Sequence, residues 1–228
     1  MRLGPKTKPT ICTPIFGRTD ACREDRLGVA DLGTPRSGLG RHRRGPSAAN
    51  PLAQGNSVEE LPDGDILASF RPISKVVRIS RQTGEILWRL GPPTVAGQHA
   101  PTMLANGNIL IFDNGVHRLD DSMPYSRVIE VDPATNEITW KYQDKPAWNF
   151  FSPRMGNAQR LPNGNTLIDE SSFGRFFEVT NGGEIVWEYV NPFFGKPFFG
   201  GPSTSQSNQV FRALRYDAEA IARARSTG

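Results

Sequence analysis

A short phrase that occurs three times constrains the fold of this chain more than any other feature. Each copy joins two apolar runs across an Asp-Gly or Asn-Gly pair, at residues 61–67, 104–115 and 161–167. Asp, Asn and Gly tolerate the positive φ angles of a tight turn, so each copy predicts a β-hairpin. A second strand-turn-strand phrase follows each copy and ends on a tryptophan: Trp88, Trp140 and Trp187.

Three units of about 50 residues with four strands each are typical of propeller blades. The expected strands are 56–61, 65–70, 74–80, 85–90, 100–104, 108–113, 126–132, 137–142, 157–161, 165–170, 174–180 and 184–189. The run 210–216 resembles the first strand of a fourth unit, and 217–225 favours a short helix capped by Asp217. The predicted fold class is therefore all-β, a partial β-propeller of three four-stranded blades plus part of a fourth.

Closed propellers typically have four to eight blades, so three units and a fraction do not close a ring. An open array exposes edge strands and one apolar blade face. We therefore expect self-association through the open propeller edges, or instability of the chain alone.

The basic character of the chain is confined to its first 50 residues. That segment holds 10 Lys and Arg against 4 Asp and Glu, whereas the other 178 residues hold 17 against 19. Gly, Pro, Arg, Ser and Thr dominate it without periodicity, which predicts a disordered basic segment over 1–50. Residues 51–216 form the expected blades and 217–228 a helix or tail. With no basic face on the blades, nucleic acid is not an expected partner.

Targeting and metal signals are weak throughout the sequence. No apolar run approaches the ~20 residues of a membrane span, so no membrane partner is expected. The start shows no apolar core of a secretory signal peptide, and the compartment stays undetermined. Cys12 and Cys22 lack a second Cys pair or a nearby His, so no metal site is predicted.

The repeat also sorts the connections onto two faces of the array. Turns after the first and third strand of each unit are tight, whereas the connections 91–99, 114–125, 143–156 and 190–209 are long and lie on the opposite face. Function usually resides in long loops on a rigid scaffold. These loops carry many aromatic residues, which indicate either an aromatic-binding surface or ordinary loop packing: Trp148, Phe150, Phe151, Phe193, Phe194, Phe198 and Phe199.

His99 and Arg118 are the candidate catalytic residues on the long-loop face. His99 opens an innermost strand, which lines the central channel, and Arg118 lies in a connection on the same face. Arg supplies a fixed charge with a forked donor set, and His acts as nucleophile or acid/base, so the pair suits an anion such as sulfate. The structural alternative is a hydrogen-bonded His99 and an ion-paired Arg118.

Residues 54–216 resemble the arylsulfotransferase family, whose PAPS-independent aryl-sulfate sulfotransferases are built on a β-propeller. The matching stretches are 56–58, 61–67, 69–71, 83–91, 98–99, 106–108, 112–115, 161–167, 211–213 and 215–216. The resemblance implies transfer of a sulfuryl group from a phenolic sulfate ester to a phenol through a sulfated His, with no cofactor. It implies substrate-binding roles for Gln54, Asn114 and Arg154.

Several positions depart from the family pattern. Where the family has His, this chain has Gln54, Leu214 and, at the position aligned with the nucleophile, Arg154. Arg stays protonated and cannot replace a His nucleophile. The alternatives to a sulfotransferase are therefore a catalytically inactive propeller that binds anions or aromatic groups, and a truncated, diverged fragment without activity of its own.

Overall fold

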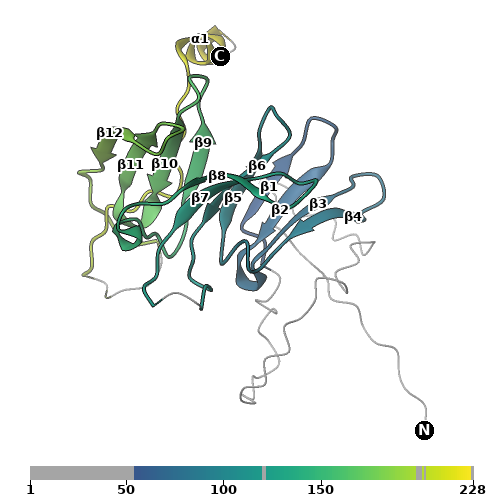
Figure 1. Cartoon of the computed structure of the whole chain (residues 1–228). Helices are drawn as coiled ribbons and strands as arrows, with labels where there is room; N and C mark the ends of the chain where they lie inside the picture. The colour runs from purple at the N-terminus through teal and green to yellow at the C-terminus, as the bar shows by residue number, and fades with distance from the viewer. Residues whose placement is uncertain (1–53, 120–121, 199–201, 203, 227–228) are drawn as a thin grey trace.

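The computed structural model describes residues 54–119, 122–198, 202 and 204–226. Three four-stranded antiparallel sheets stand side by side in chain order (Figure 1), in the orders β1-β2-β3-β4, β5-β6-β7-β8 and β9-β10-β11-β12. Each sheet is a meander in which consecutive strands pair, as in a propeller blade. We call the sheets blades one, two and three; the prediction of three such units is confirmed.

The strands lie within a residue or two of the expected ranges. Blade one comprises β1 (Ser57–Glu60), β2 (Ile66–Phe70), β3 (Lys75–Ile79) and β4 (Ile86–Leu90). Blade two comprises β5 (His99–Met103), β6 (Ile109–Asp113), β7 (Arg127–Val131) and β8 (Ile138–Tyr142). Blade three comprises β9 (Asn157–Arg160), β10 (Thr166–Glu170), β11 (Arg175–Val179) and β12 (Ile185–Val190). Single 3-10 turns occupy η3 (Arg71–Ile73), η4 (Ala147–Asn149) and η5 (Ser171–Phe173).

The three Gly turns are local copies of one another. Gly64, Gly107 and Gly164 have φ angles of 86°, 87° and 86°, which an L side chain rarely adopts. In each turn the Gly N–H donates to the carbonyl of the Leu three residues earlier, at 2.8 to 2.9 Å. This chemistry explains why the repeated phrase fixes the hairpins so firmly.

Two hydrophobic clusters lie between neighbouring blades, and a third lies within blade one. Ile109 and Ile111 of β6 face blade one, whereas Leu110 and Phe112 face blade three. Successive side chains of a strand point to opposite faces, so the continuous apolar run of β6 fits a strand that is buried on both sides. Blade two is therefore packed between its two neighbours.

Tryptophan side chains join each blade to the next. The Trp88 indole of β4 donates to Asn136 Oδ1 in the β7–β8 turn at 2.8 Å. The Trp140 indole of β8 donates in the same way to the Asn181 carbonyl in the β11–β12 turn at 2.8 Å. Trp187 holds the equivalent position in β12 but is 42% exposed.

The segment 210–216 does not form the strand that is expected for a fourth unit. Side chains of β9 bind its backbone by hydrogen bonds instead. Asn157 Oδ1 accepts from the Ala213 N–H at 3.0 Å, and Gln159 Oε1 accepts from the Arg215 N–H at 2.8 Å. Beyond it the chain enters helix α1 (Ala218–Ser226), where Asp217 Oδ1 caps the Ala220 N–H, as predicted. A ladder needs a second strand, and none of the described residues supplies one here.

The predictions of disorder over 1–50 and the two cysteines lie outside the described residues. Among the residues that are described, no helix is long and apolar enough to cross a membrane.

Candidate functional site

His99 enters blade two through a distorted start of β5. The register shifts between His99 and Thr102, and Ala100 between them has a φ of 44°. Bulges of this kind re-aim a side chain, and backbone strain in a non-glycine residue is concentrated at functional sites. The distortion turns the His99 side chain toward the loop that follows β6, where it is 9% exposed.

Asn114 fixes the tautomer of His99. The Asn114 amide nitrogen donates to the carbonyls of Ser152 and Met155, both at 2.7 Å, so its Oδ1 can only accept. Oδ1 lies 2.7 Å from His99 Nδ1, which must therefore carry the proton. In the neutral ring, Nε2 then holds the lone pair.

Arg71 reaches this region from η3 of blade one. Its Nη2 donates to the Pro153 carbonyl at 3.1 Å, across 82 residues of sequence, in the loop that leads into β9. Its Nε is buried and has no hydrogen-bond partner among the residues that the structure describes. A buried guanidinium nitrogen without an acceptor is costly, and such an unpaired group in a native fold asks for an explanation.

His117 is tied to the same loops through Ser74. Ser74 Oγ lies 2.8 Å from His117 Nδ1 and accepts the Gly97 N–H at 3.0 Å. Ser74 itself is buried in the left-handed conformation, at a φ of 51°, just after η3. This arrangement places His117 beside the entry to β5.

Positive charge dominates the electrostatics of these residues. Burial lowers the pKa of Arg71, and the charge of Arg154 lowers it further. Burial lowers the pKa of His99 to about 4, opposed by the hydrogen bond to Asn114 and the Gly97 carbonyl, and assisted by the charge of Arg71. Burial and Arg71 also lower the pKa of His117. We call Arg71, His99, His117 and Arg154 the Arg71 cluster.

The Arg71 cluster has the character of an anion site. The charge of Arg154 disfavours that of Arg71, and burial together with Arg71 disfavours the charged form of both imidazoles. Perturbed groups of this kind gather at functional sites, and like charges held together are relieved by an anion. All four residues lie in connections after second or fourth strands or at the start of β5, on the face predicted for function.

Arg118 has a different position from the one its predicted role requires. Its Nη2 donates to the buried Asp113 carboxylate at 2.7 Å, and its guanidinium stacks on the Tyr125 ring at 4.3 Å. Asp113 also accepts from Arg127 Nε at 2.8 Å. Arg118 thus forms an ion pair, as in the structural alternative to a catalytic role. The charge that acts on His99 comes from Arg71 instead.

The remaining predicted residues divide between the site and its surroundings. Asn114 is fully buried against His99, and Arg154 belongs to the Arg71 cluster. Gln54 is exposed at the start of the described chain. Of the loop aromatics, Phe150 is fully buried in the core, whereas the side chains of Trp148, Phe193, Phe194 and Phe198 are exposed.

Sequence reasoning missed Arg71 and His117. Arg71 directly follows a second strand, on the face already assigned to function, and this is the signal that would have found it. His117 neighbours Arg118, and the sequence offers no ground for preferring one to the other. Within the described ranges, no group of three His, Cys, Asp or Glu side chains could hold a metal ion.

A family model described as arylsulfotransferase (ASST) matches residues 31–192 of the chain. The match includes all three blades, starts upstream of the expected boundary at residue 51, and ends just beyond β12. The comparison with curated proteins gives no match.

Solved structures that match part of the chain include two lyases. A protein of unknown function from Bacteroides caccae is 20% identical, with a TM-score of 0.45 over 60% of this chain and 46% of its own. A streptogramin B lyase is 17% identical, with a TM-score of 0.47 over 64% and 43%. Virginiamycin B lyase from Staphylococcus aureus, in an inactive variant with quinupristin, is 16% identical, with a TM-score of 0.45 over 64% and 44%. The chain spans less than half the length of each.

Proposed function

The chain belongs to the arylsulfotransferase family, and on this premise we propose that the Arg71 cluster binds the sulfuryl group of a phenolic sulfate ester. The observation that carries the proposal is the buried Arg71 Nε without a partner, beside the like charge of Arg154. A sulfuryl group offers three acceptor oxygens and a negative charge. It would satisfy the Nε donor and relieve the repulsion between the two guanidinium groups.

We further propose that His99 Nε2 is the nucleophile that accepts the sulfuryl group. Its lone pair would attack the sulfur, forming an N–S bond while the S–O bond breaks and the phenolate leaves with the electron pair. A phenol that loses its proton to solvent would then attack the sulfur, and the N–S electron pair would return to Nε2. Nδ1–H bonded to Asn114 supports this role, because it holds the ring in the tautomer with an open Nε2.

A second candidate is binding of the ester without turnover. It is favoured by Arg154, which stands where the resemblance places the family's nucleophile and cannot attack sulfur. In this case the Arg71 cluster would hold the aryl sulfate, and His99 would remain a buried structural imidazole.

Single-turnover mixing with 4-nitrophenyl sulfate distinguishes the two candidates. If His99 is the nucleophile, 4-nitrophenol is released in proportion to enzyme, and mass mapping finds one SO3 group on the peptide that contains His99. His99→Ala should abolish both signals. Arg81→Ala, an exposed residue of the β3–β4 turn on the opposite face, is the matched control and should keep them.

Binding of the same ester is measured separately by calorimetry. Arg71→Gln should weaken binding by about tenfold or more, because it removes a charge-assisted donor. Binding without nitrophenol release would establish the second candidate. Binding that is unchanged in both Arg71→Gln and Arg154→Gln would contradict the proposed site altogether.

A further inference from the structure

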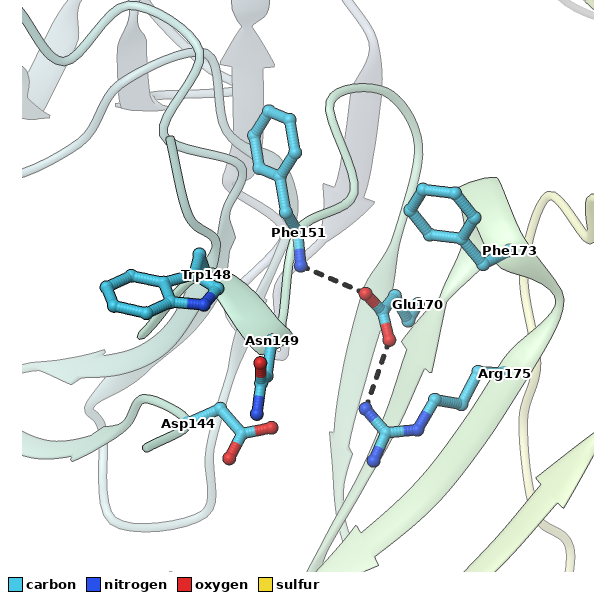
Figure 2. Close-up of a pocket in the computed structure, with 7 residues that line it drawn as sticks. All are labelled: Asp144, Trp148, Asn149, Phe151, Glu170, Phe173 and Arg175. Carbon is cyan, nitrogen blue, oxygen red and sulfur yellow. Dashed lines mark hydrogen bonds and ion pairs between the residues drawn. The ribbon is translucent and has the colours of Figure 1, made fainter. Parts of the chain in front are cut away.

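A second pocket opens on the same face, between blades two and three. It has a volume of about 490 Å³, and Figure 2 shows its lining residues. Trp148 and Asp144 lie on one side, and Glu170, Phe173 and Arg175 lie on the other. The volume falls in the range of small-molecule sites, roughly 300–1,000 Å³.

The walls of this pocket are aromatic and open to solvent. Trp148 and Phe173 are each 56% exposed, although large apolar side chains are usually buried. Trp148 sits in η4 and Phe173 in η5, so each ring is carried by a short helical turn within a connection between strands. Exposed rings on two sides of one cavity are suited to hold a flat or cationic group by stacking.

The charges in the pocket favour a cation over an anion. Arg175 is held by two carboxylates, with Nη1 3.2 Å from Glu170 Oε2 and Nε 3.3 Å from Glu188 Oε1. Glu170 also accepts the Phe151 N–H at 2.9 Å. Asp144 uses Oδ1 to accept the Lys145 N–H at 2.7 Å, whereas none of the described residues forms a hydrogen bond with its Oδ2. The pocket is therefore lined by two carboxylates, Asp144 and Glu170, and by one guanidinium whose charge Glu170 and Glu188 offset.

We infer that this pocket binds an organic ammonium ion, with the cationic head at Asp144 and its body between Trp148 and Phe173. The Arg175 guanidinium already forms ion pairs with Glu170 and Glu188, so it leaves Asp144 to bind the ligand's cationic head. A desolvated cation over an indole ring gains more than an exposed one. The inference does not depend on the proposed transfer of sulfate.

Titration calorimetry with benzyltrimethylammonium tests this assignment. We expect saturable binding that weakens about tenfold in Asp144→Asn and in Trp148→Ala, with benzyl alcohol binding at least tenfold more weakly. Asp132→Asn in the β7–β8 turn removes the same charge on the opposite face and should leave binding unchanged. Equal binding of benzyl alcohol, equal weakening by Asp132→Asn, or no binding to the folded chain would overturn the assignment.

A different observation concerns the outer face of blade three. All six residues of β12 are exposed, whereas β4 and β8 each have buried or half-buried positions. Trp88 and Trp140 each donate to the turn of the next blade, but Trp187 has no such turn among the described residues. Arg215 stacks over the Trp187 ring at 5.0 Å, as Arg160 does over Trp140 at 4.5 Å. The face is therefore built like the two faces that a further blade covers.

We propose that this face takes up blade one of a second copy of the chain, head to tail. The β3–β4 turn of blade one corresponds to the turns that receive Trp88 and Trp140. Its residues Arg81, Gln82 and Thr83 are exposed, so a Trp187 indole of a second copy can approach this turn. The contact would repeat a packing that already occurs twice in the chain.

Sedimentation velocity over a hundredfold range of concentration tests the head-to-tail contact. We expect concentration-dependent association that Trp187→Lys weakens at least tenfold. Trp148→Lys, which changes an exposed tryptophan away from this face, should associate like the parent chain. A monomer at every concentration, or association that Trp187→Lys leaves unchanged, would overturn the proposal.

Discussion

At the scale of single residues, Asn114 determines what His99 can do. Its amide nitrogen is committed to two loop carbonyls, so its oxygen faces the imidazole as a fixed acceptor. The ring is held neutral by burial, with Nδ1 protonated. One amide thus sets the tautomer of His99 and joins blade two to the loop that carries Arg154.

Asn114→Asp should raise the pKa of His99 well above 4. A carboxylate at this position favours the imidazolium, and opposite charges at this distance shift a pKa by one unit or more. The two bonds to the Ser152 and Met155 carbonyls would be lost, at a cost of about 1–3 kcal/mol each in unfolding free energy. NMR titration of the imidazole gives the pKa, and Asn136→Asp in an outer turn is the control that should leave it unchanged.

The folded chain should lose stability in acid through His99. The folded-state pKa is about 4 and the unfolded one 6.5, so this contribution is complete above pH 6.5 and disappears as the pH falls to 4. The loss amounts to about 3 kcal/mol. Asp169 acts oppositely, because burial raises its pKa to about 7 and its contribution weakens as the pH rises to that value. The free energy of unfolding at pH 7 minus that at pH 4.5, measured with urea, should be lower in His99→Gln than in the parent chain, because Asp169 is left unopposed. An equal value in the two chains would exclude the effect.

At the scale of elements, the three Gly hairpins share one backbone geometry. The hydrogen bonds between the turn and the third strand run in one direction in blades two and three and in the reverse direction in blade one. In blades two and three, two Asn side chains of the turn donate to a carboxylate on the third strand, Glu130 and Glu178 respectively. In blade one, Asp63 and Asp65 accept from Arg78, which occupies the same position. The turn and the third strand are therefore matched within each blade.

Arg78→Glu should destabilise blade one, because it places three carboxylates together on partly exposed side chains. We expect a loss of about 1–2 kcal/mol in the free energy of unfolding. Adding Asp63→Asn and Asp65→Asn reproduces the arrangement of blades two and three and should recover most of the loss. Chemical unfolding of the single and triple variants measures both values. A triple variant no more stable than Arg78→Glu would contradict this matching.

At the scale of the whole molecule, the sequence predicts the blades but not the cluster between them. Each hairpin depends on residues within a few positions of each other, such as Asn106 and Gly107, so local turn chemistry specifies it. The contact between Arg71 and Pro153 depends on how the blades curve around their axis. That curvature follows from packing between blades, which no local pattern encodes. For the same reason Arg118, rather than Arg71, was the predicted partner of His99.

Hydrogen exchange should be slowest in β6 and fastest in β12. Ile111 and Phe112 are fully buried between two neighbouring blades, whereas every residue of β12 is exposed. Arrays in which each unit contacts only its neighbours open from their free faces. Peptides covering 109–113 and 185–190, compared by mass spectrometry at pH 7, should differ in protection by at least tenfold. Equal protection would show that the blades open as one cooperative unit.

The indole hydrogen bonds of Trp88 and Trp140 bear on how chains built from such repeats evolve. Blades one and two each present an indole donor at the fourth strand, and blades two and three each present an acceptor in the turn before it, so the two junctions are alike. A duplication or deletion of one whole period preserves every junction it does not remove. Gains and losses of complete units should therefore be tolerated far better than insertions of a few residues within a strand, which would displace the tryptophan from its acceptor.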